Sequence, residues 1–133
     1  LVRAAISVLL QQPSLGLALE PPYGFKDLKQ PGVDLLVELL SLVHARPEIS
    51  TGALLQHFAE RDELVSLQKL ASHVLPGTDA TWRMELLDAA VQLEKQTVEQ
   101  RIEELQAKSR DIGLDEADKY ELRALLQARI GRH

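Results

Sequence analysis

Neither proline nor glycine occurs between Gly77 and Gly113, and this gap constrains the fold more than any other feature of the chain. Thr78 and Asp79 are good N-cap residues, because their side-chain oxygens can accept the unpaired N–H groups of a first helical turn. A helix of about 34 residues, at ~1.5 Å per residue, is roughly 50 Å long and exceeds the width of a small domain. We therefore expect this helix to extend beyond the domain in which it begins.

The apolar pattern along this stretch changes at Glu94. Before that residue the pattern is a broad face suited to burial in a bundle, made by Leu86, Leu87, Ala90, Val91 and Leu93. The polar segment Glu94–Thr97 interrupts the face and is expected to allow a bend, although no proline or glycine forces one. Beyond it, Val98, Ile102 and Leu105 form a narrow seam that one partner helix can cover.

A partner for that seam follows directly. Gly113 suits the left-handed position that ends a helix, and Asp115 can cap the next one, with Asp118 completing a short-armed capping box. The next helix carries a matching apolar stripe made by Leu122, Leu125, Leu126 and Ile130. Two antiparallel helices on a tight turn form a helical hairpin. Such a hairpin has too little core to be stable alone, so we expect it to depend on the rooted long helix or on another protein.

The chain before the long helix is divided by its prolines. Pro13 ends a first apolar helix, and Pro31 is a favoured first-turn residue for a second one. Because this second helix is strongly apolar, we expect it to be the central helix of a bundle. Ser50 can cap the helix after it. The segment Glu20–Gln30 is expected to be an ordered loop, with apolar residues that plug against the bundle: Tyr23, Phe25 and Leu28.

No segment shows the alternation and β-branched residues of a strand, so the predicted fold class is all-α. We expect a helical bundle over residues 1–93, then a hairpin over residues 94–133 that the long helix connects to it. A chain of 133 residues with 45% apolar residues can bury a core. It begins inside an apolar helical pattern, so we interpret it as a fragment of a longer protein.

The composition excludes several classes of function. A net charge of −5 argues against a broad phosphate-binding surface. Without cysteine there are no disulfides and no thiolate metal sites. No apolar run approaches the ~20 residues that span a bilayer. The four histidines lack the spacing of a helical metal site, and there is no glycine-rich phosphate loop or nucleophile elbow. We expect no catalytic residue, metal site or cofactor.

The unusual feature is the apolar surface of the hairpin. One interpretation is that its apolar residues bury one another and nothing else, namely Val98, Ile102, Leu105, Leu122, Leu125 and Leu126. The other interpretation is a protein interface, because projecting elements with more apolar surface than they can bury themselves usually mark one. An acidic helical chain without catalytic groups fits the second interpretation better.

Short motifs in a fixed order add a family resemblance. They are Pro31-Gly32, Leu35-Leu36, Glu38-Leu39, Ile49-Ser50-Thr51-Gly52, Leu54-Leu55, His57-Phe58, Leu67-x-Lys69-Leu70, Leu86-x-Asp88-Ala89, Arg101-Ile102-x-x-Leu105, Gly113-Leu114 and Glu121-Leu122-x-x-Leu125. The set resembles the C-terminal domain of bacterial replicative (DnaG-type) primases over nearly the whole chain. The end departs from the family pattern, because the chain closes with Gly131-Arg132-His133, whereas the last helix of the family tends to run helically into terminal basic residues.

The resemblance implies a function in DNA replication. In that family this domain binds the N-terminal region of the hexameric replicative helicase, mainly through the terminal hairpin, and recruits primase to the fork. The parent chain would then be a cytoplasmic bacterial DNA primase, a nucleotidyltransferase whose zinc-binding and RNA-polymerising domains lie upstream. This domain would have no catalytic activity, would not bind nucleic acid strongly, and would be a monomer or a hairpin-exchanged dimer.

We expect the partner site on the hairpin, with an apolar centre and a polar rim. The residues are Ile102, Leu105, Leu122, Leu125, Leu126, Gln127, Arg129 and Ile130. The alternative is an all-α nucleic-acid-binding or adaptor module with a basic stripe made by Arg101, Lys108, Arg110, Arg123 and Arg129. Glutamates interleave with these residues at spacings that favour pairs within one helix, so a continuous basic face is not expected.

Overall fold

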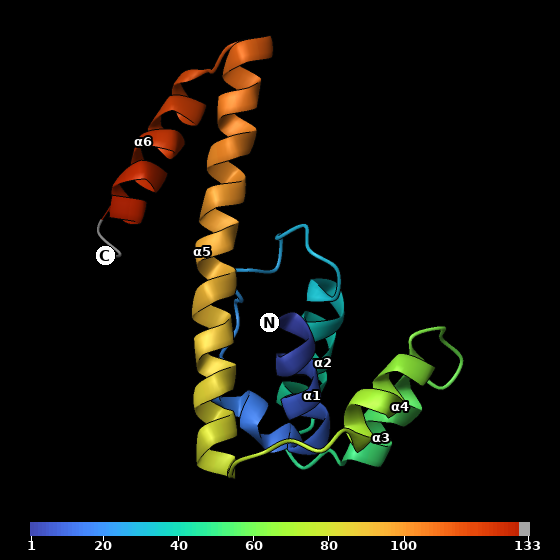
Figure 1. The fold of residues 1–133 in the computed structure, drawn as a ribbon. Coiled ribbons are helices and arrows are strands. Elements are labelled where there is room, and N and C mark those ends of the chain that lie inside the picture. Colours follow the sequence, from blue (N-terminus) through green and yellow to red (C-terminus); the bar gives the residue numbers. More distant parts are fainter. Residues whose placement is uncertain (131–133) are drawn as a thin grey trace.

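The computed structural model describes residues 1–130, and every regular element within them is a helix (Figure 1). The predicted all-α class is confirmed. The elements in order are α1 (Val2–Gln11), the 3-10 helix η1 (Pro13–Ala18), α2 (Val33–Ala45), α3 (Thr51–His57), α4 (Leu64–Ser72), α5 (Asp79–Asp111) and α6 (Glu116–Ile130). Within these residues, no helix is both long and apolar enough to cross a membrane.

Helix α1 is the centre of the bundle. It packs against α2, α3, α4, α5 and η1, and residues 5–10 are all buried. Helix α2 instead leaves Ser41 exposed and Leu35 half-buried. The expectation that α2 would be central was wrong. Mean apolarity favoured α2, but the central helix is the one that packs against the most other elements, and only the tertiary structure shows that this is α1.

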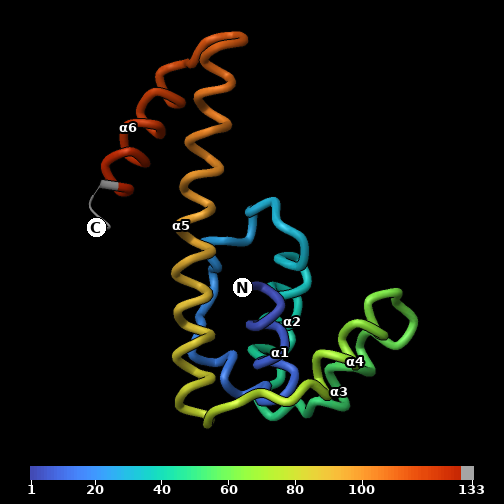
Figure 2. Tube along the Cα trace, in the orientation of Figure 1, coloured from blue at the N-terminus to red at the C-terminus, as the bar shows by residue number. Residues whose placement is uncertain are grey.

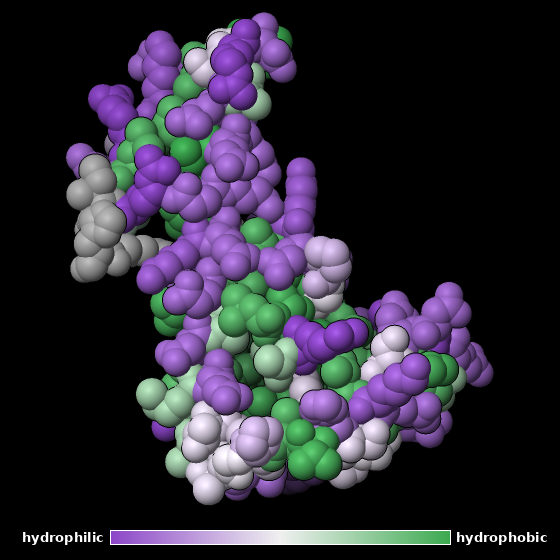
Figure 3. Space-filling model, viewed as in Figure 1, coloured by the Kyte–Doolittle hydropathy of each residue, from purple (hydrophilic) through white to green (hydrophobic). Residues whose placement is uncertain are grey.

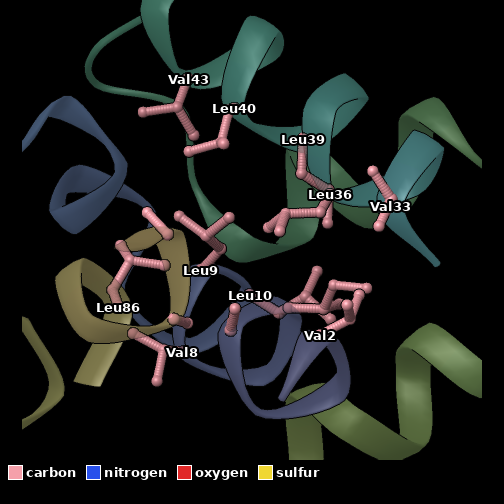
Figure 4. Close-up of a cluster of buried hydrophobic side chains, with 14 of the residues drawn as sticks. Val2, Val8, Leu9, Leu10, Val33, Leu36, Leu39, Leu40, Val43 and Leu86 are labelled. Carbon is pink, nitrogen blue, oxygen red and sulfur yellow. The ribbon is translucent and has the colours of Figure 1, made fainter. Parts of the chain in front are cut away.

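The core lies between α1, α2 and the first half of α5 (Figure 4). Figure 4 shows Leu9 of α1 between Leu40 of α2 and Leu86 of α5. The core cluster also draws on α3, α4 and the loop before α2, and its last member along the chain is Leu93. Ile102 and Leu105 are buried as well but lie outside this cluster. The subdomain boundary between residues 93 and 94 stays a prediction, because a subdomain is defined by independent folding.

The start of α2 differs from the sequence prediction. Pro31 was expected in its first turn, but α2 begins at Val33 and Gly32 precedes it with φ 92°. A Cβ atom at Gly32 would lie 2.9 Å from Cγ1 of Val2, so the close approach of α1 also requires glycine. Because Gly32 leaves the helical region, Pro31 belongs to the preceding loop.

The termini of α3 and α5 match their predicted caps. The Ser50 hydroxyl accepts the N–H of Ala53 at 3.1 Å, which caps α3. The Thr78 hydroxyl accepts the N–H of Thr81 at 3.4 Å at the start of α5. At its other end Gly113 has φ 82°, and its N–H donates to the Lys108 carbonyl at 3.0 Å. The long helix therefore begins and ends where the sequence predicted.

The loop between η1 and α2 runs beside α5 (Figure 2). Tyr23, Phe25 and Leu28 of this loop are buried in the core cluster, as predicted. The Tyr23 ring packs against that of Phe25, with centroids 5.9 Å apart. Its hydroxyl is also buried but finds no hydrogen-bond partner within residues 1–130. Burying this group without a partner costs free energy.

We predict that Tyr23→Phe leaves the free energy of unfolding unchanged or raises it by up to about 1 kcal/mol, because it removes a buried hydroxyl that makes no hydrogen bond. Urea denaturation followed by circular dichroism measures the change. Tyr120→Phe is the matched control, since Tyr120 is exposed and its replacement should change nothing. A loss of about 1 kcal/mol in Tyr23→Phe would show that the hydroxyl has a partner in solution.

Candidate functional site

Helix α6 lies antiparallel to the second half of α5, apart from α1–α4 (Figure 1). The two helices form the predicted hairpin. The N–H of Asp118 donates to the Asp115 carboxylate at 2.8 Å, so Asp115 caps α6 as expected. The Asp118 side chain turns instead to Lys108, so the reciprocal half of the capping box is not formed. Asp115 therefore stabilises the start of α6, while the Asp118 side chain pairs with Lys108 of α5.

The two helices of the hairpin bury their apolar residues unequally. On α5, Ile102 is 2% exposed and Leu105 is 1% exposed. On α6, none of residues 116–129 is buried, and Leu122, Leu125 and Leu126 are each half-buried. A helix that packs against one neighbour keeps part of its apolar stripe in contact with water. The leucine stripe of α6 therefore keeps part of its apolar surface in contact with water.

The predicted site residues divide into three groups. Ile102 and Leu105 lie in the interior of the hairpin, so they can position α6 but offer almost no surface. The half-buried leucines and the exposed Gln127 and Arg129 share α6 and can reach a partner. The side chain of Ile130 lies outside the described part of the chain, as do Gly131, Arg132 and His133 with their departure from the family pattern.

Ion pairs join the two helices of the hairpin. Arg101 donates two hydrogen bonds to Glu121, from Nε at 2.7 Å and from Nη2 at 2.9 Å. Lys108 pairs with Asp118, and Arg129 Nη1 lies 3.0 Å from Glu99 Oε2. We expected pairs within one helix, and two such pairs form, between Arg101 and Glu104 at 3.2 Å on α5 and between Lys119 and Glu116 at 3.5 Å on α6. The others cross the hairpin, because folding brings α6 beside α5 and sequence spacing shows only one helix at a time.

These pairs alter the acidity and the charge pattern of the hairpin. The hydrogen bonds from Arg101 hold the pKa of Glu121 below its ordinary value, and the hydrogen bond from Lys108 lowers the pKa of Asp118. Three members of the candidate basic stripe, at positions 101, 108 and 129, thus carry carboxylate partners. A continuous basic face does not result. Figure 3 shows hydrophilic and apolar side chains side by side along the hairpin.

Sequence reasoning missed one prominent side chain, Tyr120, which is 73% exposed on α6. It lies off the leucine stripe, where an aromatic residue has no packing role within the hairpin. Ala117 and Ala124 are exposed at i−3 and i+4 from it, which places them on the same face of the helix. An aromatic residue between small residues on a solvent-facing side was the available signal, because tyrosine is enriched where interfaces concentrate their binding energy.

His44 and His57 make structural contacts. His57 Nε2 lies 2.9 Å from Glu38 Oε2, and Arg61 Nη1 approaches the same carboxylate oxygen at 2.7 Å. His44 Nε2 lies 2.6 Å from the Leu19 carbonyl oxygen. Within residues 1–130, no group of three or more histidine, aspartate or glutamate side chains is arranged to hold a metal ion.

We predict that Glu121→Gln weakens the hairpin in a pH-dependent way. The pKa of Glu121 is lower in the folded protein than in the unfolded chain, so its pair with Arg101 stabilises above about pH 4.3 and is lost as pH falls through the folded-state value. Both side chains are partly exposed, so we expect a loss of about 0.5 kcal/mol near neutral pH and a smaller loss at an acid pH well below about 4.3.

Urea unfolding at the two pH values measures this loss. Glu103→Gln is the matched control, because Glu103 is exposed on α5 and forms no ion pair within the described residues. An equal loss at both pH values in Glu121→Gln would show that the pair with Arg101 is not its cause.

Comparison with known proteins identifies the family. Residues 2–125 match the family model described as DNA primase DnaG DnaB-binding. The chain is similar to the DNA primase of Escherichia coli (strain K12), with 29% identity over 126 residues that cover 95% of this chain and 22% of that protein. The DNA primase of Pasteurella multocida (strain Pm70) is 31% identical over 129 residues, which cover 94% of this chain and 22% of that protein. The chain thus spans about a fifth of the length of these relatives.

The fold is also similar to a solved structure. The crystal structure of the DnaG primase C-terminal domain from Vibrio cholerae matches with a TM-score of 0.77 and 34% sequence identity. The match covers 94% of this chain and 95% of that one. The resemblance found in the ordered motifs is therefore confirmed: the chain belongs to the DnaB-binding family of DnaG primases.

Proposed function

We propose that this chain is the helicase-interaction domain of a bacterial DNA primase, and that it binds the N-terminal region of the hexameric replicative helicase through α6. The family described as DnaB-binding supports the partner. The observation that supports the site is the leucine stripe of α6, which packs mainly against α5 and stays half-buried. Binding would recruit primase to the fork and modulate helicase and priming activity.

The proposed surface has a centre and a rim. Leu126, with Leu122 and Leu125 on the same stripe, supplies the apolar centre, while Gln127 and Arg129 supply polar groups beside it. Interfaces commonly have this arrangement, with an apolar centre and a hydrated edge. Ile130 extends the stripe by sequence spacing. Ile102 and Leu105 are buried and would contribute indirectly, because they hold α6 against α5.

The remaining roles follow from the parent protein. The catalytic activity, a DNA-directed RNA polymerase or nucleotidyltransferase reaction, would belong to other parts of a primase. This domain would contribute binding, in the cytoplasm of a bacterium and without a cofactor. It would act as a monomer, or as a dimer whose molecules exchange hairpins after α5 bends at residues 94–97. Light scattering of the purified protein distinguishes these two states.

We predict that Leu126→Ala weakens binding to the helicase N-terminal region by about 2 kcal/mol, roughly 30-fold in Kd, if Leu126 is a central contact. Titration calorimetry measures the affinity, and circular dichroism must show unchanged helicity. Val65→Ala is the matched control, because Val65 is exposed on α4 of the bundle and should leave binding unchanged. Equal affinity for the parent and a folded Leu126→Ala variant would place the site elsewhere.

Arg129 needs a separate test, because it also pairs with Glu99 across the hairpin. We predict that Arg129→Ala slows association with the helicase region and reduces its salt dependence, as expected for a charge at the rim. Glu99→Ala breaks the same ion pair and leaves Arg129 in place, so it should bind with the parent's association rate. Equal effects of the two variants, measured by stopped-flow kinetics, would mean that Arg129 acts only within the hairpin.

The nucleic-acid-binding alternative is distinguished by how steeply binding depends on salt concentration. Phosphate binding weakens steeply and log-linearly with salt concentration, whereas helix packing depends on salt much less. The carboxylate partners of Arg101, Lys108 and Arg129 disfavour this alternative. Tight and strongly salt-dependent binding of single-stranded DNA by this chain, without binding of the helicase region, would replace our proposal with it.

A further inference from the structure

The loop before α2 makes a contact with α5 that the proposed interface does not use. The backbone N–H of Lys29 donates to Oε1 of Gln100 at 2.6 Å. Nε2 of Gln100 donates back to the carbonyl oxygen of Asp27 at 3.1 Å. One side-chain amide thus closes two hydrogen bonds with the backbone of a loop that lies 71 to 73 residues earlier in the chain.

The two hydrogen-bond partners, the Lys29 N–H and the Asp27 carbonyl, together determine which residue type fits at position 100. A backbone N–H requires an acceptor and a carbonyl requires a donor, and a primary amide supplies one of each. Glutamate would keep the acceptor but lose the donor. Alanine would lose both. Glutamine is therefore matched to this stretch of loop backbone, and we call its pair of hydrogen bonds the Gln100 latch.

The latch lies beyond the polar segment Glu94–Thr97. The core cluster ends at Leu93, and the next buried apolar residue on α5 is Ile102, which belongs to the hairpin. Between them the loop follows α5. A Cβ atom at Gly24 would lie 3.3 Å from the Glu94 side chain, and Lys29 Nζ lies 3.8 Å from Glu104 Oε1. The loop therefore links the bundle to the far side of a segment that has few apolar anchors of its own.

A small bend at Glu94–Thr97 would displace the far end of the hairpin by several ångströms. About 13 residues separate Thr97 from Arg110, so at ~1.5 Å per residue the lever is roughly 20 Å long. A bend of about 20° would displace the far end by about 7 Å at that rise per residue. Water competes for both hydrogen bonds of the latch, since their groups are exposed. The latch can therefore favour one direction of the hairpin without locking it.

We propose that Gln100 is a positioning residue, which fixes the direction of the hairpin relative to the bundle by holding α5 to the backbone of residues 27–29. With the latch open, α5 bends at Glu94–Thr97 and the hairpin samples other directions. The hairpin itself stays intact, because the ion pairs that cross it join α5 directly to α6: Arg101 with Glu121, Lys108 with Asp118 and Arg129 with Glu99.

Distances between paired spin labels test the latch. The chain contains no cysteine, so Ser41→Cys on α2 and Arg110→Cys near the end of α5 give one specific pair, both at exposed positions. We expect a narrow distance distribution in the parent. In Gln100→Ala it should broaden or shift by several ångströms, as the lever length implies, and Gln100→Glu should act in the same direction. Gln106→Ala, an exposed glutamine on the same helix, is the matched control and should change nothing.

A second label pair within the hairpin separates orientation from unfolding. Glu103→Cys on α5 and Ala124→Cys on α6 are both exposed, and their distance should be the same with and without Gln100→Ala. An unchanged bundle-to-hairpin distance in Gln100→Ala overturns the proposal. A change in both label pairs also overturns it, because Gln100 would then stabilise the hairpin rather than direct it.

Helicase binding gives an additional measurement that rests on the proposed function. If the latched direction is the one that binds, the apparent Kd of Gln100→Ala rises by the inverse of the fraction that keeps this direction, about threefold if a third of the molecules keep it. A parent chain that does not bind the helicase region overturns the proposed function but leaves the spin-label test of the latch in force. An unchanged label distance overturns the latch whatever the affinity.

Discussion

The structure depends on the continuity of α5, because one helix serves two separate apolar interfaces. Leu86 and Leu93 pack into the core around α1, while Ile102 and Leu105 lie beneath α6. The backbone hydrogen bonds of an uninterrupted helix carry the direction of the first half into the second. A chain break or a sharp kink between the two halves of α5 would leave the hairpin connected to the bundle through the exposed contacts of the loop before α2.

The same arrangement explains why the hairpin is stable and yet open. Full burial of an aliphatic side chain contributes about 1.5 to 3 kcal/mol, and the hairpin buries Ile102 and Leu105 on one side only. A partly exposed pair such as Arg101 with Glu121 adds at most about 1 kcal/mol. This suffices to hold α6 on a helix that is already rooted in the bundle. It leaves the leucines of α6 half-buried, and this is the surface that we propose for the helicase.

Local chemistry explains which parts of the fold could be predicted. Helix limits at Thr78, Gly113 and Asp115 follow from caps and a left-handed glycine, which involve only neighbouring residues. The centre of the bundle could not be predicted, because it depends on how many faces of α1 other elements cover. The partners of Arg101 and Arg129 were missed for a related reason, since both lie on the other helix of the hairpin.

The sequence by itself determined the all-α class, the long helix, the hairpin and the stripe of α6, because periodicity and caps are properties of short segments. It also carried the family resemblance. Only the tertiary structure decided that Ile102 and Leu105 are buried while the leucines of α6 stay half-buried. Only it placed the backbone of residues 27–29 against Gln100. Both facts depend on which segments meet after the chain folds, and spacing along one helix holds no information about the neighbour that covers it.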